Sequence, residues 1–253
     1  MRAKIQLSGT IVLYNENVNE LKKAIDSFLA IPVPKKLFLI DNSSSDDLRY
    51  LNQHPEIHYR FSNNNIGFGA GHNEVINDIR DLSTYHLILN PDVIFKPEDI
   101  SKLIKELQYD NTLAMVAPRV LYPNGAHQIT ARRYPKPLDL ILRRIKINSN
   151  RLADQEYRNY DLKQAFYPDF IHGCFMLFKT SVFIKLNGFD TRYFLYMEDV
   201  DICKKIDDAG FKKLYYPKIE IIHIKQQGSA KKLNLLYHHL SSAIKYFIKW
   251  GVK

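Results

Sequence analysis

Two acidic segments and one histidine carry the side chains best suited to chemistry. The first segment is Asn90-Pro91-Asp92, which follows the apolar run Leu87 to Leu89. It places one carboxylate at the carboxyl end of a predicted buried strand, where open α/β sheets bind ligands. Magnesium and manganese take oxygen ligands, often one or two carboxylates with substrate phosphates completing the shell. Asp92 is therefore a candidate for holding a divalent cation against a diphosphate, and the alternative is a plain turn with Asp92 as a helix cap.

The second acidic segment is Glu198-Asp199-Val200-Asp201, which opens a predicted helix ending near Gly210. The helix dipole favours ionised carboxylates in a first turn, and this alone can explain the acids. The functional interpretation is that one of these ionised carboxylates, beside an acceptor hydroxyl, serves as general base. His223 follows near the end of a predicted strand. A lone histidine is most often structural, but His223 could complete the metal site begun by Asp92.

A glycine-rich segment from Asn65 to Asn73 precedes a predicted helix that runs to about Arg80. Glycine at every second position lets the backbone approach a ligand closely at a helix N-terminus. The spacing differs from the dinucleotide fingerprint and from the P-loop, which disfavours a plain NAD or ATP site. Asp41 ends another predicted strand, where its carboxylate could accept the imide N–H of a pyrimidine base. The alternative is that Asp41 and the serines after it only form a turn and a helix cap.

Apolar, β-branched runs alternate with segments of helical spacing, which predicts a Rossmann-like α/β fold with a mainly parallel sheet flanked by helices. The predicted strands span residues 4–13, 37–40, 57–61, 87–89, 115–118, 175–178, 214–217 and 219–224. The predicted helices span residues 18–30, 98–107 and 233–250, besides those that follow Gly71 and open at Glu198. Residues 153–168 are polar and tyrosine-rich, and we expect a mobile loop there.

The composition limits the class of protein. The chain has 253 residues, of which 45% are hydrophobic, enough for one large α/β domain or two small ones. No run of apolar residues approaches a membrane span and no signal peptide is seen. Cys174 and Cys203 are too few for a disulfide framework, and we expect buried thiols in a cytoplasmic protein.

The net charge of +9 is concentrated in two segments. Residues 132–151 hold seven Lys/Arg and one acid, and residues 204–253 hold eleven Lys and three acids. Such a distribution suggests an anionic partner, namely a nucleic acid, a phosphate-bearing substrate or a membrane surface, and the alternative is ordinary solvated lysines. The C-terminal helix has one predicted apolar face, which either packs on the domain or lies on an anionic bilayer. Its residues are Leu236, Leu240, Ala243, Ile244 and Phe247.

Several of these segments, in this order, resemble the family 2 glycosyltransferases of the GT-A fold, most closely their bacterial rhamnosyltransferase-like branch. They read TIVLYN, LFLIDNSSSDD, NNIGFGAGHN, LILNPDV, NGFDTRYFLYMEDVDIC and IHIKQQGS, and the resemblance covers residues 8–230. It implies one GT-A domain over residues 1–253 with an amphipathic C-terminal helix. The nucleotide-binding half would span about residues 1–92, the acceptor-binding half about 93–229 and the basic helix about 230–253.

The resemblance also implies roles for individual residues. Asp199 of the Glu198-Asp199 motif would be the catalytic base, and Asp92 with His223 would hold Mg²⁺ or Mn²⁺. Asn90 replaces the first acid of the usual metal-binding motif, which makes metal dependence less secure. The basic segment 132–151 is not a family signature and is assigned to acceptor recognition. The residues implied for the nucleotide and donor are Thr10, Val12, Tyr14, Asn15, Asp41, Asn65, Gly67, Gly69, Asn73, Asn90 and Asp92.

The implied activity is inverting transfer of a sugar, with dTDP-L-rhamnose as the first choice of donor and a UDP-sugar as the second. The implied acceptor is a saccharide, lipid-linked through a polyprenyl diphosphate at the cytoplasmic membrane surface, in O-antigen or capsule synthesis. The alternatives are a non-catalytic nucleotide-sugar-binding homologue and a metal-dependent nucleotidyltransferase. A nucleic-acid binder is disfavoured, because the basic charge avoids the glycine-rich and acidic motifs. The oligomeric state stays open, a homodimer included.

Overall fold

The computed structural model describes residues 5–145, 147, 149–224 and 233–252. Over these residues a central sheet contains β1 (Ile5–Leu13), β2 (Lys35–Asp41), β3 (Ile57–Phe61), β4 (Ser83–Leu89), β5 (Val93–Ile94), β6 (Leu113–Leu121), β7 (His127–Gln128), β10 (Phe175–Lys179) and β11 (Lys212–His223). Its strand order is β3-β2-β1-β4-β10-β6-β11-β5, with β7 paired to β6. A separate small sheet joins β8 (Ala131–Arg132) to β9 (Phe170–Ile171).

The half of the sheet built from β1 to β4 is parallel, as the sequence predicts. Helix α1 (Val18–Leu29) begins where the side chain of Asn17 accepts the N–H groups of Asn19 and Glu20, a normal N-cap. The helix packs so closely on β1 that a Cβ added to Gly9 would lie 2.3 Å from the Phe28 ring. Because parallel strands end at one edge, the residues after β1, β2 and β4 meet there.

The other half of the sheet is mixed. Strand β10 lies between β4 and β6 and is antiparallel to both, whereas β11 is parallel to β6. The two strands predicted at 214–217 and 219–224 are one strand, β11, whose register shifts between Tyr216 and Glu220. Pro217 lies in that interval and lacks the N–H that a regular ladder needs. The antiparallel entry of β10 brings the residues before Phe175 to the carboxyl end of β4.

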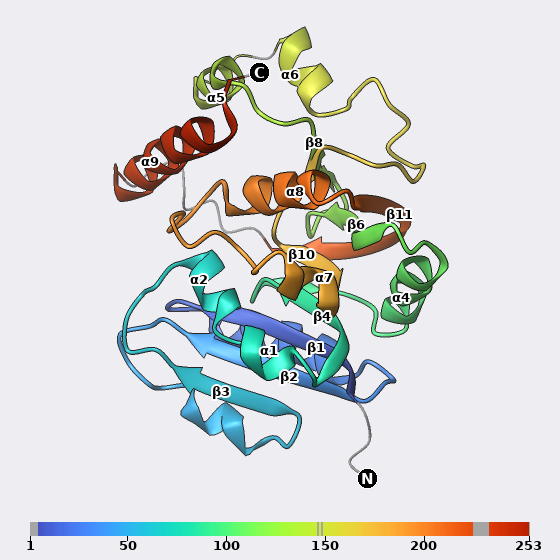
Figure 1. Ribbon diagram of the computed structural model, residues 1–253. Helices are drawn as coiled ribbons and strands as arrows, with labels where there is room; N and C mark the ends of the chain where they lie inside the picture. The colour runs from blue at the N-terminus through green and yellow to red at the C-terminus, as the bar shows by residue number, and fades with distance from the viewer. Residues whose placement is uncertain (1–4, 146, 148, 225–232, 253) are drawn as a thin grey trace.

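Helices cover both faces of the sheet (Figure 1). One apolar core joins the sheet to α1 and α4 (Asp99–Tyr109), and the other joins it to α3 (Ile76–Ile79), α7 (Thr180–Lys185) and α8 (Glu198–Asp208). The helix predicted after the glycine-rich segment is interrupted, and α2 (Phe68–Asn73) ends before α3 begins. A short 3-10 turn, η1 (Arg49–Gln53), precedes β3.

The segment after β8 forms α5 (Pro137–Arg144) and α6 (Asn150–Gln155), and the chain closes with α9 (Leu233–Trp250). These three helices lie at the top of the view in Figure 1. The predicted apolar face of α9 is divided, because Ala243 is buried whereas Leu240 and Ile244 are more than half exposed. Among the described residues, none of the helices has both the length and the hydropathy to cross a membrane.

Candidate active site

The turns after β1 and β2 are joined at the carboxyl edge of the sheet. Asn15 adopts a left-handed conformation with φ of 53°, which asparagine tolerates better than most residues. Its N–H donates to the Ser43 hydroxyl at 2.9 Å, and the Asn42 N–H donates to the Leu13 carbonyl at 2.8 Å. Tyr14 is half exposed beside this turn. The predicted segment Tyr14-Asn15 therefore lies against the Asp41 turn, as a shared nucleotide site requires.

Asp41 is fully buried and its carboxylate is already engaged by the protein. One oxygen accepts the Ser43 N–H at 2.9 Å and the other accepts the Tyr59 hydroxyl at 2.8 Å. The turn considered as the alternative role of Asp41 is thus present, although each oxygen keeps a second lone pair for a base. Thr10 lies deeper still. It is completely buried, and its hydroxyl is 3.2 Å from Nε2 of His86, so its side chain does not reach the edge.

The glycines of α2 and the turn before it are needed for packing within the protein. A Cβ on Gly67 would lie 2.3 Å from the Phe194 carbonyl oxygen, one on Gly69 would lie 2.8 Å from Phe189, and one on Gly71 would lie 2.8 Å from Val12. Each of these glycines thus lies in close contact with protein atoms, and the close contact with a ligand that the sequence suggested stays a prediction. Val12, predicted at the donor site, is thus the residue that α2 packs against.

Two asparagines of the same segment hold its backbone. The Asn65 side chain accepts the Gly67 N–H at 3.0 Å. The Asn73 side chain donates to the Phe189 carbonyl at 2.8 Å and accepts the Phe189 N–H at 2.9 Å. Asn73 therefore joins the glycine-rich segment to the turn Asn187-Gly188, which lies ahead of the second acidic segment. The sequence does not reveal this link, because its partners are 116 positions apart.

Asp92 and His223 are brought together although they are far apart in sequence. The Asp92 carboxylate lies 3.2 Å from Nε2 of His223, and Nδ1 of His223 lies 3.1 Å from the Gln128 side-chain oxygen. Burial opposes the charged imidazole, but Cys174 and Asp92 outweigh it and raise the pKa of His223 to about 10. The side-chain oxygen of Asn90 is buried beside them and accepts no hydrogen bond from the described residues.

This donor set fits a divalent cation once the His223 imidazole has released its proton, because only the neutral ring binds a metal. Two ligands bound at right angles with bonds of about 2.1 Å are about 3 Å apart, close to the separation of the Asp92 and His223 atoms. No group of three or more His, Cys, Asp or Glu side chains gathers to hold a metal among the described residues. A cation here would consequently need oxygens from a ligand, as magnesium and manganese sites at diphosphates do.

Glu16 belongs to this edge and was missed by the sequence reasoning. Its pKa is raised from 4.5 to about 7, first by burial and then by the charges of Asp92, Glu20 and Asp41, although the Tyr14 N–H that Glu16 accepts lowers it. Several carboxylates thus repel one another where a cation is expected. Its position two residues beyond Tyr14 was the available signal, but only the fold shows that Asp92 is near.

Asp199 and Glu198 differ in their surroundings although they are adjacent. Burial raises the pKa of both carboxyls. The Asp199 anion is stabilised by the N–H groups of Val200 and Gly173 and by the charge of Arg132. Glu198 has less support, since one of its oxygens is buried without a hydrogen-bond partner among the described residues. Of the two carboxyls, Glu198 therefore has the less stabilised anion, and Asp199 is the one better suited to act as base.

The two acidic segments meet at the start of β10. The Gly173 N–H donates to the Asp199 carboxylate at 3.2 Å, and the carbonyl of the next residue, Cys174, accepts the Asn90 N–H at 2.9 Å. Consecutive residues thus contact both segments. Asn90 and Asp199 therefore lie beside the same two consecutive residues, which their separation in sequence does not reveal.

Helix α9 supports the segment that leads to Asp199. Tyr196 and Met197, the two residues before Glu198, have φ of 68° and 67°, a strained conformation for large side chains. Asp201 is fully buried and accepts hydrogen bonds from the Lys249 ammonium at 2.8 Å and the Trp250 indole N–H at 2.7 Å. The end of α9 therefore helps to hold the first turn of α8 in place.

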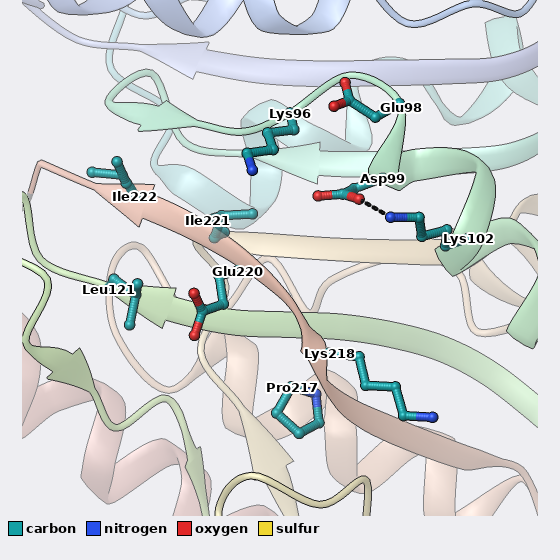
Figure 2. Close-up of a pocket in the computed structure, with 10 residues that line it drawn as sticks. All are labelled: Lys96, Glu98, Asp99, Lys102, Leu121, Pro217, Lys218, Glu220, Ile221 and Ile222. Atoms are coloured by element: carbon teal, nitrogen blue, oxygen red, sulfur yellow. Dashed lines mark hydrogen bonds and ion pairs between the residues drawn. The ribbon is translucent and has the colours of Figure 1, made fainter.

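A pocket of 520 Å³ lies at another edge of the sheet, beside β11 and the start of α4. Figure 2 shows its ten lining residues, with Asp99 and Lys102 joined by an ion pair of 2.7 Å. The lining contains three lysines and three acids, so its charges balance. It contains none of the residues predicted for the donor, the metal or the base, and we assign it no role in the reaction.

Comparisons with known proteins agree with this geometry. Residues 9–186 match the model of the family described as glycosyl transferase family 2. The chain is 26% identical over 254 residues to the rhamnosyltransferase WbbL of Escherichia coli (strain K12), covering 94% of this chain and 92% of that protein. It is 25% identical over 232 residues to an N-acetylglucosaminyl-diphospho-decaprenol L-rhamnosyltransferase of Mycobacterium tuberculosis, covering 85% of this chain and 76% of that protein.

Two solved structures share the fold. GalNAc-T7 with UDP, GalNAc and Mn²⁺ aligns with a TM-score of 0.67 and 16% identity, over 88% of this chain and 44% of that one. The mannosyltransferase PcManGT from Pyrobaculum calidifontis, with GDP-Man and Mn²⁺, aligns with a TM-score of 0.63 and 16% identity, over 96% of this chain and 65% of that one. At this identity the likeness concerns the fold, and both neighbours are GT-A glycosyltransferases.

Proposed function

The chain belongs to glycosyl transferase family 2, and we propose that it is an inverting transferase that moves a sugar from a nucleoside diphosphate to a saccharide acceptor. One observation carries this proposal. The base candidate Asp199 accepts the Gly173 N–H, and the next residue, Cys174, accepts the N–H of Asn90, which lies two residues before the cation candidate Asp92. A single displacement needs both groups in one site, with a base beside the acceptor and positive charge beside the leaving group.

The donor is held, in this proposal, at the edge formed by the ends of β1, β2 and β4. Tyr14, Asn15 and Asp41 face the base and ribose, and Asn90 with Asp92 faces the diphosphate. When bound at Asp92 and His223, Mg²⁺ or Mn²⁺ neutralises negative charge on the diphosphate. The orphaned oxygen of Asn90 and the raised pKa of Glu16 support a cation at this place.

Asp199 acts as the general base. Its carboxylate accepts the proton of an acceptor hydroxyl as the oxygen attacks the anomeric carbon from the face opposite the diphosphate, which inverts that carbon. The Gly173 and Val200 N–H groups hold the carboxylate in position. Protonated Glu198 adds no second negative charge beside it. The strained Tyr196-Met197 backbone and α9 keep Asp199 pointed at the acceptor site.

The relatives support a more specific substrate assignment. Two of them are named as rhamnosyltransferases, and the name of one states an acceptor joined to a lipid through a diphosphate. We assign dTDP-L-rhamnose as the donor and a polyprenyl-diphosphate-linked saccharide as the acceptor, in synthesis of a cell-surface polysaccharide such as O-antigen or capsule. Another UDP-sugar in the same site is the alternative donor.

The exposed apolar residues of α9 support contact with the inner face of the cytoplasmic membrane. Tyr237, Leu240, Ile244 and Ile248 are 54–81% exposed and recur every three or four residues, which places them in one stripe. Helix α5 lies near this helix, because the charge of its Arg144 acts on His239. Deletion of α9 is a poor test, since the same helix holds Asp201.

Point substitution in the exposed stripe separates the two roles of α9. Ile244→Ser with Ile248→Ser should reduce co-sedimentation with phosphatidylglycerol vesicles and leave turnover of a soluble acceptor unchanged. Tyr109→Ser is the matched control, because Tyr109 is 92% exposed on α4. Unchanged co-sedimentation of the double variant would remove the membrane assignment.

The proposed function is tested first by thermal stabilisation against a nucleotide panel with and without Mn²⁺. Binding to the folded state alone raises the midpoint according to RT ln(1 + [L]/Kd). We expect stabilisation by dTDP or UDP that Mn²⁺ increases, that NAD, ATP and GDP do not produce, and that Asp92→Ala loses. Transfer to a diphosphate-linked acceptor then distinguishes an enzyme from a binding homologue. No stabilisation by any nucleoside diphosphate would refute the donor site.

A further inference from the structure

Three arginines surround one buried glutamate beside the candidate base. We call Arg132, Arg143 and Arg158, with Glu156, the arginine cluster. Arg132 comes from β8, Arg143 from α5, and Glu156 and Arg158 follow α6. Figure 1 shows β8, α5 and α6 in the upper part of the view, away from β1, β2 and β4.

The cluster contains more positive charge than Glu156 can neutralise. Arg143 donates to one Glu156 oxygen at 2.5 Å, and Arg158 donates to the other at 2.7 Å. The Nη2 atom of Arg132 is 3.7 Å from Oε1 of Glu156, which is too far for a hydrogen bond. Three guanidinium groups and one carboxylate make a net charge of +2 in a region where the Glu156 side chain is only 7% exposed.

Arg132 is the incompletely paired member. Its side chain is 18% exposed, and its Nε atom is buried with no hydrogen-bond partner among the described residues. Burial and the charge of Arg143 lower its pKa to about 10, so it remains cationic near neutral pH. A buried charge without a close partner is costly. Among the described residues, the Arg132 guanidinium thus has no close partner, and its planar donor fork is of the kind that binds phosphate oxygens in a bidentate way.

The position of Arg132 relative to Asp199 is defined by main-chain pairing. Arg132 is opposite Phe170 in the β8–β9 ladder, and the His172 N–H donates to the Thr130 carbonyl at 3.1 Å. The next residue after His172 is Gly173, whose N–H holds Asp199. The charge of Arg132 also stabilises the Asp199 anion. An anion at Arg132 would thus lie near the acceptor side of the base.

We propose that the arginine cluster binds the diphosphate of the acceptor, with Arg132 as the principal contact, while the acceptor sugar lies at Asp199. This inference rests on the proposed function, because it takes Asp199 as the base. The same α5 that supplies Arg143 exposes Leu138 and Ile141, and Ile145 directly after the helix is exposed as well. Those apolar residues are suited to the lipid that follows the diphosphate.

The test measures binding of inorganic pyrophosphate by calorimetry to the full chain saturated with dTDP or UDP and Mn²⁺, so that the donor site is closed to the probe. We expect binding that Arg132→Gln weakens about tenfold or more, since a lost hydrogen bond to a charged group has an effect of this order. Arg132→Lys keeps the positive charge but not the planar guanidinium. Its affinity for pyrophosphate should lie between those of the wild-type chain and Arg132→Gln. Arg60→Gln is the control, because Arg60 on β3 pairs with Asp78 and lies outside the cluster.

A second arm distinguishes a lipid-linked diphosphate from a free one. Farnesyl diphosphate should bind more tightly than pyrophosphate, and Ile141→Ser should remove that difference while leaving pyrophosphate binding unchanged. Equal binding of both probes would identify the site as one for a free diphosphate and overturn the acceptor assignment.

Two outcomes overturn the site itself. One is no detectable pyrophosphate binding to the wild-type chain, which needs no variant to fold. The other is equal binding by wild type, Arg132→Gln and Arg60→Gln. Failure of the proposed function is distinguishable, because it appears as no stabilisation by any nucleoside diphosphate in the panel. Pyrophosphate binding that depends on Arg132 can be measured in either case.

Discussion

Glu16→Gln should stabilise the protein at pH 8 and have little effect at pH 5. The pKa of Glu16 is raised from 4.5 to about 7, first by burial and then by neighbouring carboxylates. A raised carboxyl pKa means that its contribution to stability is fully present below pH 4.5 and is lost as the pH rises through 7. Glutamine has no charge to desolvate, so the variant escapes that loss.

The expected gain in unfolding free energy at pH 8 follows from the same pKa. A change from 4.5 to about 7 corresponds to about 3 kcal/mol at about 1.4 kcal/mol per pKa unit. Glu16 is partly exposed, and solvent screening reduces the expected gain to about 1–2 kcal/mol. Urea unfolding at both pH values measures it as a change in midpoint at constant slope. Asp26→Asn, in an exposed acid of α1, is the matched control.

The same experiment tests the acid cluster at the donor edge. Because the charge of Asp92 contributes to the raised pKa, Mn²⁺ with dTDP should reduce the advantage of Glu16→Gln at pH 8. An equal gain in unfolding free energy at pH 5 and pH 8, or a loss at pH 8, would refute the reasoning about Glu16. An advantage that Mn²⁺ and dTDP leave unchanged would count against a cation beside Asp92.

Three further predictions concern the base, its support and the packing of α2. Asp199→Asn should lower kcat about 10²–10⁴-fold, while thermal stabilisation of the protein by nucleotide stays unchanged. Glu198→Gln mimics the protonated acid and should keep most of the activity. Similar losses of kcat in the two variants would contradict their separate roles. Trp250→Phe removes one hydrogen bond to the turn that carries Asp199 and should lower kcat more than donor KM, with vesicle binding unchanged; a loss confined to vesicle binding would argue against positioning by α9. Gly71→Ala should reduce the free energy of unfolding by about 1–3 kcal/mol through overpacking. Adding Val12→Ala to the same chain should restore part of that free energy, measured by urea unfolding. No recovery in the double variant would show that Val12 is not the residue that the added methyl group meets.

Much of the fold could be predicted because its signals are local. The β-branched run before Tyr14, the helical spacing after Asn17 and the apolar run before Asn90 each encode one element, and β1, α1 and β4 form there. The candidate groups were also local, since polar residues directly follow these strands. β11 was predicted as two strands, because Pro217 interrupts the ladder pattern that sequence reasoning uses.

The roles of individual residues depended on contacts that periodicity does not encode. The glycines after Asn65 were expected to approach a ligand, but their free space is taken up by Phe194, Phe189 and Val12. Thr10 was expected at the donor site, but its hydroxyl is used by His86 inside the sheet. Each of these contacts involves a partner that is distant in sequence, and the predicted donor roles of these residues stay predictions.

The sequence by itself determined the chemistry available to this protein: an acid after β4, two acids opening α8, and a strongly basic segment around α5. Which of these groups work together was decided by the tertiary structure. The antiparallel entry of β10 joins Asn90 and Asp199 through Gly173 and Cys174, and the β8–β9 ladder brings Arg132 toward the same base. The physical reason is that strand and helix periodicity act over a few residues, whereas strand pairing and charge burial depend on surfaces that exist only once the chain has folded.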